Sequence, residues 1–374
     1  MHAIDRLTIK GYKSIRSLEN FEMRRLNVLI GANGAGKSNF VGFFRLLRNL
    51  IEQRLQLALA VEGGADVLLF MGSKMTWEVD GRFDFGADSY SFSLIPTSDN
   101  RFTFSSEEAI HTTGDGEPHV HLFTPGLYES RLKDTLGFPT RVVFESLSSW
   151  VVYHFHDTSP LAPVRRQHAI NDDEYLREDA ANLPSFLYRI RTTHPDHYQR
   201  IRQTVRMAAP FFDDFKLRPV SDKPHLTQLE WLQIGSDYPF GVHQLSDGTL
   251  RFICLTTALM QPSMPATILF DEPELGLHHH ALALLGALFH KAAGESQIVI
   301  STQSPALLNE FEPEDIIVVE RVNGESIFQR LDRANFSEWL EESSIGDLWQ
   351  KNVLGGGPHE DRFFEPVAGA VRES

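Results

Sequence analysis

The chain has 374 residues, of which 42% are apolar, and its formal net charge at pH 7 is -15. This size and apolar content allow one large domain or two ordinary ones with a substantial core. The acidic balance argues against a surface coated with basic residues for DNA, although it leaves room for a local basic groove. Cys254 is the only cysteine, so an intrachain disulfide is excluded and a reducing compartment is favoured. Since the longest apolar run, 281–289, is too short to span a bilayer, we expect a cytoplasmic protein with no membrane partner.

The first 50 residues predict two strands, a glycine-rich loop and a helix, in that order. The apolar residues of Leu7–Ile9 and of Leu26–Ile30 carry the strand signal, and the second run has the composition of a buried strand. The helix after the loop has an apolar face at helical spacing: Phe40, Val41, Phe43, Phe44, Leu47 and Leu50.

The loop itself, Gly31–Ser38, matches the phosphate-binding P-loop pattern G-x-x-x-x-G-K-[ST] at every required position. Its glycines let the backbone curl so that successive N–H groups point at phosphate oxygens, and the following helix adds the positive end of its dipole. Lys37 is expected to reach the β- and γ-phosphates of ATP, and Ser38 to ligate Mg²⁺. The alternative, a glycine-rich turn with a chance lysine, is disfavoured by the strand and helix on either side. The predicted nucleotide-binding residues are Asn33, Gly34, Ala35, Gly36, Lys37, Ser38 and Asn39.

The middle of the chain predicts two insertions. The first, 75–127, is expected to be an antiparallel β lobe, because its apolar and polar residues alternate over short runs separated by turn residues. Those runs are 76–79, 90–94 and 102–104. The second, 128–224, is expected to be a helical insert, in which 184–205 has helical spacing with a break near Pro195.

The later part of the chain returns to a pattern of strands and helices. Its buried-strand candidates are 267–270, 298–301 and 316–319, and Val322–Glu325 predicts a tight hairpin turn after the last of them. We therefore expect 1–74 and 225–350 to form one discontinuous α/β core, followed by a tail at 351–374.

Two carboxylates, Asp271 and Glu272, follow the apolar strand 267–270. At the end of a P-loop sheet, Asp271 would hold Mg²⁺ through water, and Glu272 would take a proton from the water that attacks the γ-phosphate. An ordinary strand end with acidic residues is the alternative, which the upstream P-loop disfavours.

Leu245–Thr249 resembles the L-S-x-G signature of the ABC ATPases, and it lies between P-loop and carboxylate strand in that family's order. The resemblance implies that Ser246 and Gly248 contact the γ-phosphate of ATP held by a second copy of the chain. A serine that caps the N-terminus of a helix is the plainer interpretation.

The resemblance to ABC ATPases also implies that Pro273–His278 is the D-loop, with His278 at the dimer contact, and that Gln303 occupies the switch position. A glutamine there can hydrogen-bond the γ-phosphate but cannot carry a proton charge. The family's glutamine loop is not recognisable in the sequence.

The opening Leu7–Ile15, together with 27–39 and 271–278, narrows the resemblance to RecF-, SMC- and OLD-type ATPases. The insert lacks the heptads of an SMC coiled-coil arm, and the segment after Val319 is too short for the Toprim nuclease domain of OLD proteins. The chain is similar to a small stand-alone ATPase of this class. The resemblance implies a P-loop ABC-like α/β fold, an ATP-dependent homodimer and hydrolysis of ATP with Mg²⁺.

Three functions are compatible with this resemblance. The first is an ATP-driven machine in DNA repair or anti-phage defence that acts with a separate effector and binds DNA. The second is a slow ATP sensor that scaffolds a partner toxin or nuclease. The third is a transporter ATPase subunit, which the large insert, the RecF-like start and His278 in place of aspartate all disfavour. The histidines do not indicate a metal site. A site at His278–His280 is disfavoured because consecutive residues of a helix point in different directions. A site at His154 and His156 is disfavoured because no third ligand follows at a diagnostic spacing.

Overall fold

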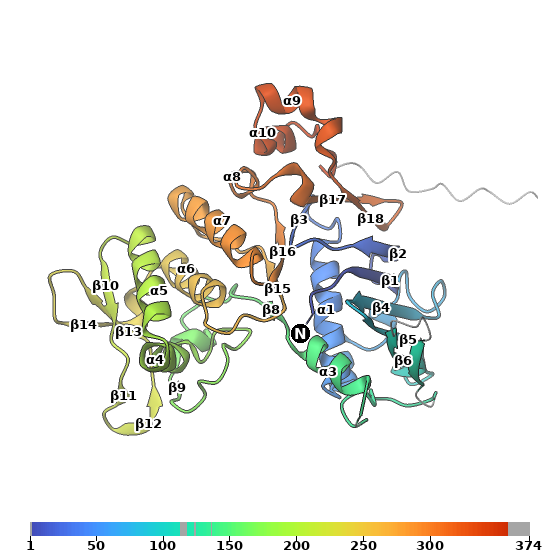
Figure 1. Cartoon of the computed structure of the whole chain (residues 1–374), viewed down its shortest axis with the longest axis horizontal. Coiled ribbons are helices and arrows are strands. Elements are labelled where there is room, and N and C mark those ends of the chain that lie inside the picture. Colours follow the sequence, from blue (N-terminus) through green and yellow to red (C-terminus); the bar gives the residue numbers. More distant parts are fainter. Residues whose placement is uncertain (1, 113–117, 123–124, 136, 358–374) are drawn as a thin grey trace, which may run out of the picture.

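The structure is a computed structural model, and it describes residues 2–112, 118–122, 125–135 and 137–357. Two six-stranded sheets carry most of the fold (Figure 1). Across the core sheet the order is β18 (Glu325–Arg330), β17 (Ile316–Val322), β3 (Leu26–Ile30), β16 (Gln297–Thr302), β15 (Thr267–Asp271) and β8 (Trp150–Tyr153). Across the β-lobe sheet it is β2 (Ile15–Glu22), β1 (Arg6–Tyr12), β4 (Val79–Phe85), β5 (Asp88–Pro96), β6 (Phe102–Thr112) and β7 (Pro118–Leu122).

The core sheet is parallel except for β18, which forms an antiparallel hairpin with β17. Helices cover both of its faces, so its central strands are buried throughout. Because side chains alternate along a strand, Val28 and Ile268 face α6 (Asp247–Leu259) and α7 (His279–Ala293), whereas Leu29 faces α1 (Lys37–Ile51). One sheet thereby separates two hydrophobic cores. The expected α/β P-loop architecture with an inserted β lobe is confirmed.

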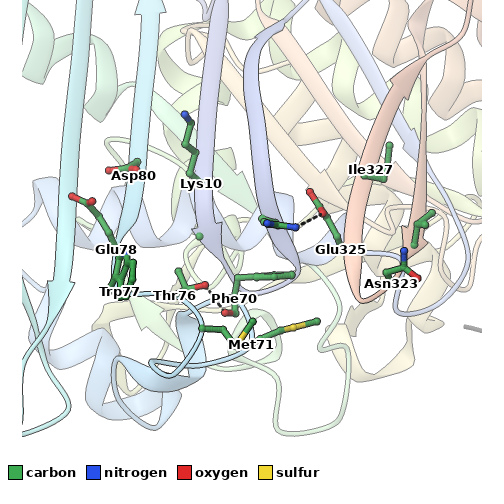
Figure 2. Close-up of a pocket in the computed structure, with 14 residues that line it drawn as sticks. Lys10, Phe70, Met71, Thr76, Trp77, Glu78, Asp80, Asn323, Glu325 and Ile327 are labelled. Atoms are coloured by element: carbon green, nitrogen blue, oxygen red, sulfur yellow. Dashed lines mark hydrogen bonds and ion pairs between the residues drawn. The ribbon is translucent and has the colours of Figure 1, made fainter. Parts of the chain in front are cut away.

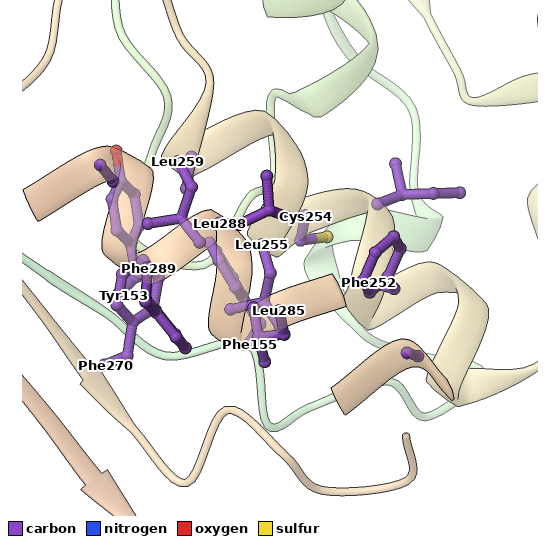
Figure 3. Packing of buried hydrophobic residues seen from close by; sticks show 14 of the residues in the cluster. Tyr153, Phe155, Phe252, Cys254, Leu255, Leu259, Phe270, Leu285, Leu288 and Phe289 are labelled. Carbon is purple, nitrogen blue, oxygen red and sulfur yellow. The ribbon is translucent and has the colours of Figure 1, made fainter. Parts of the chain in front are cut away.

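The hydrophobic core on the α6 and α7 side of the sheet (Figure 3) also contains buried residues of a second lobe, which comprises residues 168–241. Cys254 and Leu255 of α6 lie beside Leu285 of α7, and the aromatic rings of Tyr153 and Phe270 stack with centroids 5.6 Å apart. These contacts bring the end of β8 against the end of β15.

The other core joins α1 to the β lobe. The ring of Phe43 on α1 stacks on Phe83 of β4 and on Phe92 of β5, each with centroids 6.0 Å apart. Apolar side chains of these strands face α1, and the alternate positions are polar and more exposed, as expected for a sheet with one wet face.

The second lobe contains more strands than the sequence predicted. Its helices are α4 (Leu183–Thr193) and α5 (Pro195–Ala208), and the predicted break near Pro195 is confirmed at His194. Its strands are β9 (His168–Ala169), β10 (Phe212–Phe215), β11 (Pro219–Val220), β12 (Lys223–Thr227), β13 (Glu230–Gln233) and β14 (Pro239–Gly241). The remaining helices are α2 (Leu55–Glu62), α3 (Thr140–Ser148), α8 (Pro305–Leu308), α9 (Ser337–Glu342) and α10 (Ile345–Gln350).

Several strands belong to a different sheet from the one that the sequence predicted. β1 and β2 belong to the β-lobe sheet rather than the core, and β8 joins the core sheet although it lies within the predicted insert. The strand expected at 76–79 begins only at Val79. Strand partners lie far away in sequence, so local patterns cannot assign them. The bounds of the four predicted domains stay a prediction.

Part of the predicted tail packs against the P-loop. The backbone N–H of Ala32 donates to the carbonyl of Gly356 at 2.7 Å, and Gly356 N–H donates to Glu320 Oε1 at 2.5 Å. Residues 358–374 of that tail lie outside the described residues. Among the described helices, none combines the length and apolar character needed to cross a bilayer.

Candidate functional site

The predicted P-loop joins the buried strand β3 to the N-terminus of α1. Gly36 has φ 117°, and a Cβ there would collide with Ser326 Oγ, so only glycine fits this turn. The hydroxyl of Ser326 donates to the carbonyl of Ala35 at 2.6 Å and fixes the loop from the β17–β18 hairpin. Asn39 donates from Nδ2 to Ser14 Oγ at 2.7 Å, which ties α1 to the turn between β1 and β2.

Lys37 is turned back onto its own loop and is only 4% exposed. Its ammonium Nζ donates to the carbonyl oxygens of Gly31 at 2.6 Å and Ala32 at 3.1 Å. Burial lowers the pKa of Lys37, while Glu272, Asp271 and Glu274 oppose that shift. A phosphate chain could replace the two carbonyls as the partner of this cation.

The two predicted carboxylates lie at the end of β15, beside the end of β16. Asp271 is buried and accepts a hydrogen bond from the Ser301 hydroxyl, which leaves its second oxygen available. Glu272 has φ 40°, a left-handed conformation that costs a non-glycine residue about 1–3 kcal/mol. Strain of this kind is concentrated at functional sites, because the surrounding structure must enforce it.

Gln303 is brought to Glu272 by the pairing of β16 with β15. Its side-chain Nε2 donates to Glu272 Oε1 at 2.6 Å. Since β16 lies between β3 and β15 in the sheet, Gln303 stands between the P-loop strand and the carboxylate strand. The predicted switch glutamine therefore contacts the predicted base directly.

Two residues near the carboxylates were not predicted. Glu274 accepts from Thr302 Oγ1 at 2.6 Å and from the backbone N–H of Gln303 at 3.0 Å. His156 follows β8, and its Nε2 lies 2.6 Å from the carbonyl oxygen of Asp271. The one usable signal for His156 is its place just after a strand, and only the pairing of β8 with β15 brings that place to the site.

The signature residues form a separate group. Ser246 is exposed and caps α6, its Oγ accepting from Thr249 N–H at 3.1 Å. Gly248 lies so close to the loop after β15 that a Cβ would collide with the carbonyl of Gly276. Ser246, Gly248 and His278 line one small hollow of about 50 Å³. Within the described ranges, no hydrogen bond or ion pair links this group to the P-loop of its own chain.

His278 is held within its own chain. Its Nδ1 accepts from Ala281 N–H at 3.3 Å and caps α7, and its Nε2 lies 3.3 Å from the Ala208 carbonyl. Both ring nitrogens are thus engaged, so a nucleotide or dimer contact through them requires the ring to turn. The predicted role of His278 stays a prediction.

The residues present fit a nucleotide with a divalent cation. Ser38 is exposed at the start of α1, and the second carboxylate oxygen of Asp271 has no hydrogen bond within the described residues. In the part of the chain that the structure describes, no group of three or more His, Cys, Asp or Glu could hold a metal ion. Mg²⁺ usually takes one or two protein ligands and completes its shell with phosphates and water.

Several open hollows lie away from this group. One of about 630 Å³ lies on the wet face of the β lobe, between β1, the start of β4 and the β17–β18 hairpin (Figure 2). Met71, Trp77 and Ile327 border it, and Trp77 is 79% exposed. None of the predicted site residues lines this hollow.

The core has the fold of a P-loop nucleotide-binding domain, a fold that SMC heads also have. The chain belongs to the family described as "AAA domain, putative AbiEii toxin, Type IV TA system", which it matches over residues 26–309. This confirms the resemblance drawn from the motifs. No curated protein sequence matches the chain.

Solved structures show the same fold. An SMC head bound to the C-terminal winged-helix domain of ScpA has a TM-score of 0.54 at 16% identity, over 89% of this chain and 99% of that one. An SMC head from Pyrococcus furiosus with an extended coiled coil, bound to the C-terminal domain of ScpA, has a TM-score of 0.51 at 14% identity, over 91% and 99%. At such identities the likeness concerns the fold alone.

Proposed function

We propose that this protein binds and hydrolyses ATP and that it dimerises around the nucleotide. The observation that carries the proposal is the convergence of Lys37, Glu272 and Gln303 at the carboxyl ends of three adjacent parallel strands. In open α/β sheets, ligands bind at this edge. A P-loop beside a strained carboxylate supports phosphoryl transfer to water.

The reaction is ATP plus water to ADP plus phosphate. Lys37 leaves the carbonyls of Gly31 and Ala32 and pairs with the β- and γ-phosphates. Glu272 accepts a proton from the attacking water, and the amide of Gln303 hydrogen-bonds the γ-phosphate. Ser38 and Asp271 would hold Mg²⁺, which would supply positive charge against the developing negative charge on the phosphates.

The proposed dimer would bring the signature residues of one chain to the P-loop of another. Ser246 and Gly248 present a helix N-terminus to solvent and have no contact with their own P-loop among the described residues. An exposed helix N-terminus binds anions readily. A second copy that supplies this terminus completes the phosphate shell, so ATP binding joins the chains and hydrolysis releases them.

The cellular role that we favour is a DNA-related process, repair or anti-phage defence, carried out in the cytoplasm with a separate effector. The SMC-like fold and the toxin named in the family description support this choice. A slow ATP sensor that regulates a partner is the second candidate. Glutamine at position 303 favours it, because an amide at the switch position cannot carry a proton charge.

The test is the Glu272→Gln variant with ATP and Mg²⁺. Its amide cannot accept the water's proton, so we expect ATP binding to persist while hydrolysis slows by about 100-fold or more. Light scattering should then show a stable dimer with ATP and a monomer without it. Glu145→Gln on the exposed surface of α3 is the matched control and should hydrolyse like wild type. A Glu272→Gln chain that binds ATP yet stays monomeric would overturn the dimer mechanism.

The cellular role needs a second measurement on the wild-type protein. ATP turnover is compared with and without linear duplex DNA. Stimulation by DNA ends supports the DNA-acting machine. Slow turnover that DNA leaves unchanged supports the sensor.

A further inference from the structure

Glu274 connects the ends of two adjacent strands at the proposed site. It lies three residues beyond the end of β15, and its Oε1 accepts hydrogen bonds from Thr302 Oγ1 at 2.6 Å and from Gln303 N–H at 3.0 Å. Thr302 is the last residue of β16 and is buried. One carboxylate oxygen thus holds the backbone at the point where the chain leaves β16.

This hold determines where the Gln303 side chain can reach. A hydrogen bond to the backbone N–H of Gln303 fixes the position of its Cα, and the side-chain amide then donates to Glu272 Oε1 at 2.6 Å. The contacts therefore run in series from Glu274 through Gln303 to Glu272. Glu272 itself has strained backbone geometry, so it depends on its neighbours for its position.

The second oxygen of Glu274 shows that the residue is not optimised for stability alone. Oε2 is buried and has no hydrogen-bond partner in the described part of the chain. Leaving a buried oxygen without a partner lowers stability, and its presence in a folded protein calls for a functional reason. Burial also raises the pKa of Glu274, although the hydrogen bonds from Thr302 and Gln303 oppose the shift.

We propose that Glu274 is a positioning residue for ATP hydrolysis, which acts by fixing Gln303 so that its amide is directed at Glu272 and at the γ-phosphate. This inference rests on the proposed ATPase function. Glu274 does not touch the reacting atoms and transfers no proton. Its effect is carried entirely through Gln303.

The test is a double-mutant cycle on the full chain. Glu274→Ala, Gln303→Ala and the double variant are compared with wild type for kcat and KM for ATP, and for binding of a fluorescent ATP analogue. If Glu274 acts through Gln303, each single variant lowers kcat by about tenfold or more, and the double variant is no slower than either single variant. KM and analogue binding should change by less than about threefold, because the P-loop is untouched.

A conservative variant separates positioning from a general structural effect. Glu274→Gln keeps an acceptor oxygen for Thr302 and Gln303, so it should recover most of the kcat that Glu274→Ala loses. Thr302→Val removes one of the two donors and keeps Glu274, so it should fall between wild type and Glu274→Ala. Thermal unfolding identifies any variant whose lower kcat reflects misfolding. If Glu274→Ala is such a variant, the kcat values of Glu274→Gln and Thr302→Val decide whether Glu274 is a positioning residue.

The inference is overturned if the two substitutions act independently. In that case kcat of the double variant falls by the product of the factors by which Glu274→Ala and Gln303→Ala each lower it, and Glu274 acts apart from Gln303. A Glu274→Gln variant as slow as Glu274→Ala also overturns it, because the acceptor oxygen is then not what matters. These outcomes leave the proposed function intact, provided that wild type hydrolyses ATP and Glu272→Gln does not. Wild type without any turnover refutes both.

Discussion

Arg251 links three segments around the proposed site, and its removal should destabilise the whole chain. It lies in α6, is 6% exposed, and donates from its guanidinium to the carbonyls of Phe155 at 2.9 Å, His156 at 3.0 Å and Leu275. Burial lowers the pKa of Arg251. The signature helix, the segment after β8 and the loop after β15 therefore share one cation.

The expected loss follows from these contacts. Arg251→Met keeps much of the aliphatic bulk and removes every donor. A hydrogen bond from a charged group contributes about 1.5–3 kcal/mol, so three bonds at the lower figure sum to about 4.5 kcal/mol. Because the variant no longer buries a charged guanidinium, the desolvation cost of that group disappears and offsets part of the roughly 4.5 kcal/mol. We therefore expect a net destabilisation of about 3 kcal/mol. For a chain of 374 residues that corresponds to a fall in Tm of about 4 °C.

Thermal unfolding followed by circular dichroism without nucleotide measures this shift. Arg200→Met, at an exposed position of α5, is the matched control and should stay within about 1 °C of wild type. A fall of less than about 2 °C for Arg251→Met would refute the reasoning, because the three carbonyls would then be satisfied without the guanidinium.

Three further predictions concern the site and the core. Lys37→Ala should weaken ATP binding by about 100-fold or more, since it removes the P-loop cation, and fluorescent-nucleotide titration measures this; unchanged affinity would contradict the P-loop assignment. Gly248→Ala should abolish ATP-dependent dimerisation in light scattering, because its Cβ collides with the Gly276 carbonyl, whereas Gly241→Ala, whose Cβ makes only an ordinary contact with Gln244 Oε1 at 4.0 Å, should dimerise normally. Cys254 is 2% exposed and burial raises its pKa to about 12, so the folded chain should not react with a thiol reagent such as DTNB at pH 8 and should react after denaturation; rapid labelling of the native protein would show that the core between α6 and α7 opens.

The chemistry that the sequence determined is local. The P-loop, the carboxylate pair and the β17–β18 hairpin each depend on a few consecutive residues whose backbone preferences and side chains act together. Asn323 and Gly324 both have positive φ, as the predicted tight turn requires. The order of the motifs along the chain then sufficed to indicate the class of fold.

The contacts that only the tertiary structure decided are those between segments distant in sequence. Glu274 meets Gln303 because β15 pairs with β16, and His156 reaches Asp271 because β8 joins the core sheet beside β15. Period-two alternation identifies a strand and its buried faces, but it carries no information about which strand will be its neighbour. That choice depends on the packing of both faces at once, so Glu274 and His156 enter the site around Glu272 through the fold rather than through any motif.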